Sequence, residues 1–308
     1  MKAVIMAQHG GPEVLRYGDA PDPVAGPGQV VVDIHAASVN AADYKVRLGG
    51  GPYTNIHFPH ILGRDFSGIV SARGEGVTDI AVGDAVFGVT DTRDEGAYAE
   101  RIAIKAAIVA KKPARLGHAE AAAMALTSLT ALWALEDTAK LKRGETILIQ
   151  GGAGGVAGFA IQLAKHIGAT VITTASANNH DYVKKLGADR VIDYHAQDYT
   201  KSVTGCDVVF DTVGGDVRAG CYTVLKPGGR LVFISPTPDG FVPPRKDVET
   251  LRPNVARDRA HLERMLALLE AGAVWPPNIV HYKLSDAAEA HRVCESRHLR
   301  GKLIFDVR

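Results

Sequence analysis

Cysteine is scarce in this sequence, and the charge is balanced. The chain has three cysteines, Cys206, Cys221 and Cys294. They are widely spaced and form no Cys-x-x-Cys pair, which argues against a disulfide framework or a zinc cluster and favours reduced thiols of a cytoplasmic protein. Lys and Arg number 35 against 34 for Asp and Glu, so nothing predicts a nucleic-acid or anionic-membrane surface.

Long hydrophobic runs are also missing. The first apolar run, residues 1–7, is short and is interpreted as a strand and not as a signal peptide. No run approaches the length needed to span a membrane. At 308 residues the chain is long enough for two domains with substantial cores.

The chain changes character along its length. Residues 1–118 are rich in β signals punctuated by Gly and Pro, with one of the predicted strands at 98–104, and predict a mainly antiparallel half. Residues 119–137 are Ala- and Leu-rich and predict a helix. From 145 to about 239 strands alternate with helices, which is typical of a doubly wound parallel sheet, so the fold class is α/β.

The predicted elements near the C-terminus are a helix and strand, then a second helix and a closing strand. Their ranges are 259–271, 278–284, 285–296 and 302–307. Ser285 is the predicted N-cap of the second helix. We expect the closing strand to return to the β-rich half, which makes that domain discontinuous.

The most informative stretch, residues 145–168, combines a strand, a glycine turn and an apolar-periodic helix, and a second strand follows at 170–174. Its fingerprint G-x-G-x-x-G/A is Gly152, Ala153, Gly154, Gly155, Val156 and Ala157. Glycines let the backbone approach a diphosphate, and the start of a helix offers unpaired N–H groups to it. The alternative is a glycine-rich turn in an ordinary α/β domain.

Short motifs also recur in a characteristic order along the whole chain. They are residues 9–15, 37–44, 63–68, 82–88, 96–100, 129–131, 186–189, 211–215 and 300–302, together with the glycine turn. With these motifs the chain resembles a zinc-independent medium-chain dehydrogenase/reductase of the quinone oxidoreductase type.

The resemblance implies two domains and a cofactor. A GroES-like catalytic domain would comprise residues 1–118, completed by 260–308, and a Rossmann NADP-binding domain would comprise residues 119–259. A cleft would hold NADPH, and an edge strand of the nucleotide sheet would form a homodimer.

The same resemblance argues against zinc. The positions that match the first cysteine and the histidine of zinc-dependent alcohol dehydrogenases are Asn40 and Arg64, and no cysteine lies near Leu126, where the third ligand would be. The lobe for a structural zinc is missing as well, because residues 90–95 contain no cysteine. A catalytic zinc needs three N, S or O ligands. Without this Lewis acid, reduction of an activated π system is favoured over alcohol oxidation.

The end of the second nucleotide strand predicts the cofactor. No acid follows it until Asp181, whereas an NAD site usually has an Asp or Glu there. By resemblance Ser176 and His180 hold the 2′-phosphate of NADPH and Tyr194 lies alongside. The family often has Lys or Arg in place of His180, so the preference is expected to be weak or to depend on pH. The alternative is that residues 176–180 form only a polar turn.

By resemblance, four residues lie near the chemistry. Thr130 would lie against the nicotinamide, Asn40 would reach substrate or cofactor, and Tyr53 would orient a quinone oxygen or donate a proton. Tyr44 is a weaker candidate. For the tyrosines the alternative is packing with a satisfied hydroxyl, and for Asn40 it is an amide that stabilises a turn.

The leading hypothesis is an NADPH-dependent reductase that transfers hydride to a quinone or an α,β-unsaturated carbonyl acceptor without zinc. The partners expected are therefore a small-molecule quinone or enone and a second copy of the chain. Two alternatives stay open: an enoyl-thioester reductase, and a non-catalytic NADPH-binding protein.

Overall fold

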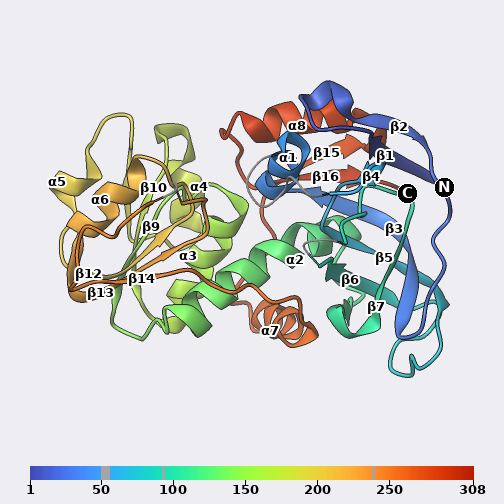
Figure 1. The fold of residues 1–308 in the computed structure, drawn as a ribbon. Coiled ribbons are helices and arrows are strands. Elements are labelled where there is room, and N and C mark those ends of the chain that lie inside the picture. The colour runs from blue at the N-terminus through green and yellow to red at the C-terminus, as the bar shows by residue number, and fades with distance from the viewer. Residues whose placement is uncertain (50–55, 92–93, 238–239) are drawn as a thin grey trace. The chain divides into compact units, whose positions relative to one another are not determined.

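The computed structural model describes residues 1–49, 56–91, 94–237 and 240–308. The chain forms two compact units (Figure 1). The first consists of Met1–Leu126, Arg257–Leu266 and Pro276–Arg308, and the second of Thr127–Ala256 and Ala267–Trp275. The divisions at 126/127 and 266/267 fall inside two helices, α2 (His118–Leu132) and α7 (Arg259–Glu270).

The first unit is built on two β-sheets. The small sheet has the order β2-β1-β4, and the large sheet has the order β15-β16-β3-β5-β6-β8 with β7 also paired to β3. The strands are β1 (Lys2–Met6), β2 (Arg16–Asp19), β3 (Gln29–Val39), β4 (His60–Ile61), β5 (Asp65–Arg73), β6 (Ala85–Val89), β7 (Arg101–Lys105), β8 (Val109–Lys111), β15 (Ile279–Lys283) and β16 (Lys302–Asp306). The pairs are antiparallel apart from β15 with β16.

The closing strand returns to the N-terminal half, as expected from the sequence. β16 pairs with β3 so that Leu303 lies opposite Val39. Apolar residues of these strands form the core together with helices α1 (Ala41–Leu48) and α8 (Ala287–Glu295). The pairing brings residues from the two ends of the chain to one place in the first unit.

Two predicted boundaries are wrong. The strand predicted at 98–104 begins at Arg101, because Tyr98 instead bonds the backbone of Val4 and Leu62. The helix predicted from Ser285 begins at Ala287, after a 3₁₀ turn, with Asp286 as its N-cap. The hydroxyl of Ser285 donates to the carboxylate of Asp286 (3.2 Å) and so does not cap a helix N–H group.

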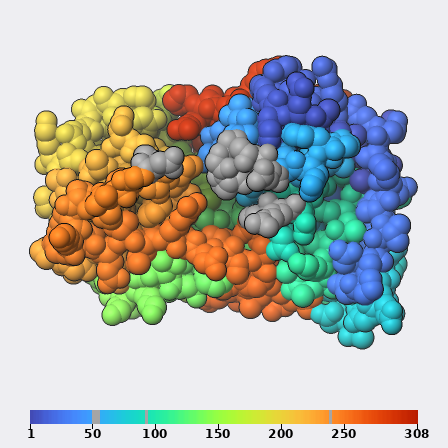
Figure 2. Space-filling model, viewed as in Figure 1, coloured from blue at the N-terminus to red at the C-terminus, as the bar shows by residue number. Residues whose placement is uncertain are grey.

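The second unit contains the doubly wound parallel sheet that the sequence predicts. Its strand order is β11-β10-β9-β12-β13-β14, which is the 3-2-1-4-5-6 order of a dinucleotide-binding sheet. The strands are β9 (Thr146–Ile149), β10 (Thr170–Thr174), β11 (Arg190–Ile192), β12 (Cys206–Asp211), β13 (Leu225–Phe233) and β14 (Glu249–Leu251). The helices between them are α3 (Gly155–Ile167), α4 (His180–Lys185), α5 (Tyr199–Ser202) and α6 (Val217–Thr223). Residues from β12 to β14, yellow to orange in Figure 2, form much of the surface seen on this unit.

The helix predicted at 119–137 is confirmed, with an irregular end. α2 is followed by a turn of π-helix at Trp133–Thr138. In the part of the chain that the structure describes, no helix is long and apolar enough to cross a membrane.

Candidate dinucleotide site and its buried neighbours

The glycine turn lies where β9 ends, and two of its positions require glycine. Gly151 has φ of 71°, a conformation that side chains other than glycine rarely adopt. A Cβ atom on Gly152 would lie closer than 3.0 Å to Oγ1 of Thr173 on β10. The backbone of the turn can therefore approach the neighbouring strand only because these side chains are absent.

Hydrogen bonds tie the turn to the strands on both sides of β9. Gly151 N donates to Oγ1 of Thr174 (3.0 Å), and Gly152 N donates to the Thr174 carbonyl (2.9 Å). On the other side, Oγ1 of Thr212 donates to the carbonyl of Gln150 (2.7 Å). The turn therefore lies between β10 and β12, where the strand order reverses and where open α/β sheets bind ligands.

The turn leads directly into α3, whose N-cap Gly154 has no side chain. The first bond of the regular helical pattern runs from Gly158 N to the Gly154 carbonyl (2.8 Å). The N–H groups of Gly155, Val156 and Ala157 precede it and have no partner within the helix. These groups, beside a backbone without side chains, fit the diphosphate of a dinucleotide.

Gly158 supports this arrangement, and the sequence analysis did not single it out. A Cβ atom there would lie 3.2 Å from Cδ1 of Leu186 and 3.7 Å from the Gly152 carbonyl oxygen. Its missing side chain thus leaves room for Leu186, at the end of α4, to pack closely against α3. The available signal was its spacing, six residues after Gly152.

The residues predicted to hold a 2′-phosphate follow β10 and β11. Thr174 is paired with Ile192, so Ser176 and Tyr194 both lie beyond the carboxyl ends of their strands. Oγ of Ser176 accepts a hydrogen bond from Nδ2 of Asn179 (3.0 Å), and Nε2 of His180 lies 3.3 Å from the carbonyl of Ala175. Tyr194 is 47% exposed. Their binding of a cofactor stays a prediction.

A buried ion pair supports the loop after β12, and the sequence analysis missed it. Asp211 accepts from the backbone N–H groups of Val213 (3.0 Å) and Gly214 (2.8 Å) and from Nε of Arg218 (3.0 Å). Arg218 also bonds Ser235, which follows β13. Asp211 and Arg218 are both buried, so they fix the loop that adjoins the glycine turn.

Thr130, predicted to lie against the nicotinamide, is in α2 and is 8% exposed. The structure places it among the buried polar residues of that helix, with Thr127 and Ser128. Its contact with a cofactor stays a prediction.

In the first unit, the side-chain amide of Asn40 is held by side chains from two distant segments. Its Oδ1 accepts from Nζ of Lys302 (2.7 Å), which also donates to the Val39 carbonyl (2.8 Å). Its Nδ2 donates to Oδ1 of Asp65 (2.7 Å), which also accepts from Oγ of Ser38 (2.7 Å). The amide is therefore fixed by a buried ammonium and a buried carboxylate. A catalytic role for Asn40 stays a prediction beside this structural one.

Asn40 is also the N-cap of α1, where Asp43 completes a capping box. Asp43 Oδ2 accepts from Asn40 N (2.8 Å) and from the hydroxyl of Tyr98 (2.7 Å). Asp43 Oδ1 is 3.8 Å from Nε of Arg64, which donates to Glu95 (2.7 Å). Burial and, after it, the nearby Glu95 carboxylate raise the pKa of Asp43 to about 7, although the Arg64 guanidinium opposes both effects.

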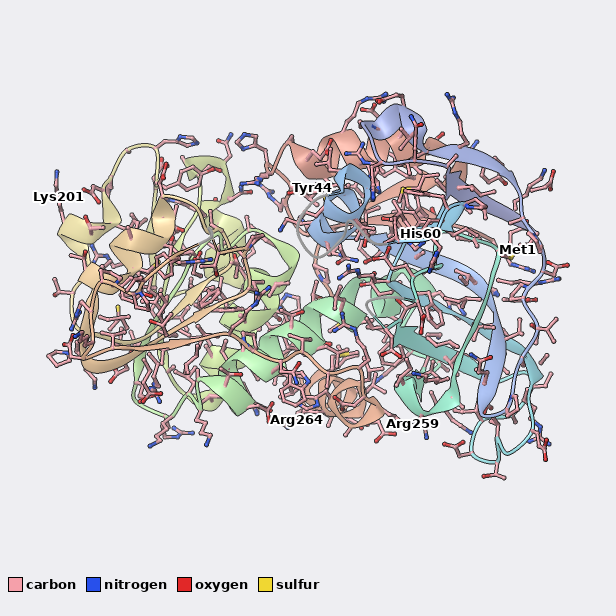
Figure 3. The ribbon with its side chains drawn as sticks, in the orientation of Figure 1. Met1, Tyr44, His60, Lys201, Arg259 and Arg264 are labelled. Carbon is pink, nitrogen blue, oxygen red and sulfur yellow. The ribbon has the colours of Figure 1, made fainter. Side chains whose placement is uncertain are left out.

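The two tyrosines predicted near the chemistry, Tyr53 and Tyr44, have different outcomes. Tyr53 lies outside the described residues, so its role stays a prediction. Tyr44 (Figure 3) is 7% exposed and belongs to the apolar core of the first unit. The contacts of Tyr44 correspond to the packing alternative.

The side chains at the positions that match zinc ligands bond other side chains. Asn40 bonds Lys302 and Asp65, and Arg64 bonds Glu95, which lies 3.0 Å from Nε2 of His60 (Figure 3). A guanidinium has no lone pair for a metal. Within residues 1–49, 56–91, 94–237 and 240–308, the His, Cys, Asp and Glu side chains form no group of three or more that could hold a metal ion.

These features define an α/β protein with a dinucleotide-binding sheet and a GroES-like unit. Residues 26–114 match the alcohol dehydrogenase GroES-like domain, and residues 186–305 match a family described as zinc-binding dehydrogenase. The chain belongs to the medium-chain dehydrogenase/reductase family, whose members are NAD(P)-dependent oxidoreductases.

Reductases are among its relatives. The chain is 36% identical to 2-methylene-furan-3-one reductase of Solanum lycopersicum, over 90% of this chain and 71% of that protein. The quinone oxidoreductase of Coxiella burnetii is 37% identical with a TM-score of 0.93, covering 100% of this chain and 99% of that one. The Escherichia coli quinone oxidoreductase complexed with NADPH is 28% identical with a TM-score of 0.91, and the match covers both chains fully.

Some relatives are much longer than this chain. It is 32% identical to the phthioceranic/hydroxyphthioceranic acid synthases of Mycobacterium, over 92% of its own length. It spans only 14% of the length of those synthases.

Proposed function

We propose that this chain is an NADPH-dependent reductase that delivers hydride to a quinone or an α,β-unsaturated carbonyl compound without zinc. The observation that carries this proposal is the glycine turn at the strand-order reversal. Its glycine-rich backbone and the N–H groups of Gly155 and Val156 suit a diphosphate. The named relatives that reduce quinones or enones support the acceptor class.

The end of β10 favours NADPH over NADH. A carboxylate there would bind the ribose hydroxyls of NAD and repel a 2′-phosphate. This chain instead has Ser176, whose Oγ accepts from Asn179 and so keeps its own O–H available to donate. His180 lies on the next turn and adds an imidazole. The NADPH of the Escherichia coli relative agrees with this choice.

The reaction would be a two-electron reduction. Bound NADPH would supply a hydride from its nicotinamide ring and leave as NADP⁺. The acceptor carbon or quinone gains that hydride, and the resulting enolate or phenolate oxygen takes a proton. That proton would come from the hydroxyl of Tyr53 or from water, and solvent would restore it.

The chemistry of the positions that match zinc ligands supports a reaction without zinc. Arg64 offers donors only, and the amide oxygen of Asn40 already accepts from Lys302. An activated π system accepts hydride without a Lewis acid, whereas a simple alcohol or ketone is usually polarised by the metal. We therefore place the substrate among quinones and enones.

Enoyl-thioester reduction is the second candidate. Two observations favour it: the match to a segment of the mycobacterial acid synthases, and the shared fold of the CurK enoyl reductase, 24% identical with a TM-score of 0.89. The chemistry is the same hydride addition to a β-carbon. The difference lies in the acceptor, which would carry a long pantetheine arm.

The test measures NADPH consumption with p-benzoquinone, methyl vinyl ketone and crotonyl-CoA. Turnover of the quinone or the enone supports the proposal. A kcat/KM far higher for the thioester would favour the second candidate. Tight NADPH binding without turnover of any acceptor would instead indicate a non-catalytic NADPH-binding protein.

A further inference from the structure

We propose that Arg218 is a positioning residue for the nicotinamide half of the cofactor, because its side chain ties together the loops that follow β12 and β13. This inference rests on the proposed function, since it assumes that a dinucleotide binds at the glycine turn. It adds a residue outside the glycine fingerprint and states which half of the cofactor depends on it.

The strand order assigns the two halves of a dinucleotide to opposite sides of β9. A doubly wound sheet consists of two mononucleotide-binding halves, and its ligand crosses the point where the strand order reverses. On one side lie β10 and β11, whose ends we assign to the 2′-phosphate of the adenosine half. On the other side lie β12 and β13. The loops at their carboxyl ends, residues 212–216 and 234–237, are therefore left for the nicotinamide half.

These two loops lie in direct contact. A Cβ atom on Gly214, in the loop after β12, would lie closer than 3.0 Å to Oγ of Ser235, in the loop after β13. Gly214 also has φ of 77°, a conformation that favours glycine. The loop after β12 begins beside the glycine turn, because Oγ1 of Thr212 donates to the carbonyl of Gln150 (2.7 Å). The two loops therefore continue from the turn along the carboxyl edge of the sheet.

The guanidinium of Arg218 bonds both loops. Its Nε donates to Oδ2 of Asp211 (3.0 Å), and Oδ1 of the same carboxylate accepts from two backbone N–H groups of the loop after β12. Its Nη2 donates to the carbonyl (3.1 Å) and to the hydroxyl oxygen of Ser235. Its Nη1 donates to Oγ1 of Thr237 (3.1 Å). One planar group thus holds the two loops in a fixed relation.

These contacts need a guanidinium and not only a positive charge. Arg218 and Asp211 are both buried, and Cζ of Arg218 lies 4.3 Å from the centroid of the Phe233 ring. The rigid fork of arginine presents several donors in one plane, whereas the ammonium of lysine is a compact point charge. Arg218→Lys should therefore keep a cation beside Asp211 and lose the link between the loops.

Arg218 would act through the loops and not by touching the cofactor. Its own side chain is buried, whereas Val213 is 41% exposed and would lie 3.1 Å from a Cβ atom on Gly151. Val213 therefore borders the glycine turn and offers an apolar contact to a bound ligand. Without the link, Val213 and Ser235 can shift, which misplaces the nicotinamide ring. The diphosphate contacts of the turn remain.

The test compares Kd for NADPH with Kd for 2′-phospho-ADP-ribose, which has the adenosine half and the diphosphate but no nicotinamide. Fluorescence titration and competition give both values, and kcat is measured with p-benzoquinone. The matched control is Arg230→Lys on β13, because Arg230 pairs with Glu145 (2.6 Å), which precedes β9 at the opposite edge of the sheet. Thr237→Val is a second variant that removes one acceptor of the guanidinium and keeps the pair with Asp211.

In Arg218→Lys we expect Kd for NADPH to rise about tenfold and kcat to fall about tenfold, with Kd for 2′-phospho-ADP-ribose unchanged. Thr237→Val should show the same selective loss of NADPH affinity, about threefold. Arg230→Lys should bind both ligands as the wild type does.

Equal losses for the two ligands, or no loss for either, would show that Arg218 does not position the nicotinamide half, while the proposed function would stand. If the wild type bound neither ligand, the proposed function would fail as well. Thr237→Val decides the question if Arg218→Lys does not fold, because it leaves the buried ion pair intact.

Discussion

The two units of this protein build their polar centres in different ways. In the second unit, backbone groups of one continuous segment, Gly151 to Ala157, form the candidate diphosphate site. In the first unit, side chains from distant segments converge: the buried Asp65 and Lys302 form one hydrogen-bonded group with the partly buried Asn40. A site made of backbone groups is disturbed by an added side chain, whereas a side-chain network is disturbed by the loss of one hydrogen-bond partner. The predictions below test this difference.

The largest effect is expected from a side chain in the turn. Gly152→Val places Cβ against Thr173 and pushes β10 away from the turn. Dinucleotide affinity should fall about 100-fold or more, since the backbone can no longer keep its shape. Fluorescence titration with NADPH measures this loss.

The matched control is Gly18→Ala on β2, where a Cβ atom meets nothing within 4 Å. It should bind NADPH as the wild type does. Unchanged affinity in Gly152→Val would show that the turn does not hold the cofactor.

In the first unit, the largest effect is expected from loss of a partner. Lys302→Met removes the ammonium that bonds Oδ1 of Asn40 and the carbonyl of Val39, so a partly buried acceptor and a buried acceptor lose this donor. The free energy of unfolding should fall by about 2–4 kcal/mol. Urea denaturation measures it, with the exposed Lys283→Met on the adjoining β15 as control. Equal stability of the two variants would contradict the network's role.

Asp43 should make stability depend on pH. Its pKa is raised from 3.8 to about 7 in the folded protein, mainly by burial. Between these values the folded state holds a proton that the unfolded state has lost, so this contribution to stability falls as pH rises from about 4 to about 7. The loss should be on the order of 1 kcal/mol per pH unit.

Asp43→Asn isolates that contribution. Buried histidines oppose it, because burial lowers the pKa of His118 to about 4 and of His291 to about 3. Their effect is common to both proteins and cancels in the difference between wild type and variant. Urea midpoints measured across this pH range should therefore show the variant gaining relative stability as pH rises. A constant difference would argue against a raised pKa.

The smallest effect is expected at the end of β10. Ser176→Ala removes one neutral donor to a 2′-phosphate and should weaken NADPH binding about fivefold, with NADH unaffected. The control is Ser202→Ala on α5, which removes a hydroxyl of the same kind from the same unit. Equal losses for NADPH and NADH would mean that Ser176 does not select the phosphate.

This difference between the two units also explains which features could be predicted from the sequence. The doubly wound sheet and the glycine turn were predictable, because strand, turn and helix follow one another within 24 residues, Glu145 to Gly168. The fit of Gly152 against Thr173 follows from the neighbouring strand in the same unit. Local patterns thus determine the candidate cofactor site.

The network around Asn40 was not predictable in this way. It depends on the register of β3 with β5 and β16, which places Asp65 opposite Ser38 and Leu303 opposite Val39. These pairings join residues 27 and 264 positions apart and leave no local pattern. Asp211 and Arg218 are only 7 residues apart, but burial, not spacing, makes their pair important. The wrong N-cap at Ser285 has a local cause, since Ser285 lies within the 3₁₀ turn Leu284–Asp286 that precedes α8.

The most direct test of this account is turnover after removal of metal. The protein is dialysed against a chelator, its zinc content is measured, and NADPH consumption with methyl vinyl ketone or p-benzoquinone is recorded. The account predicts an unchanged rate with far less than one zinc per chain. A rate that disappears with the metal and returns on adding zinc would contradict it.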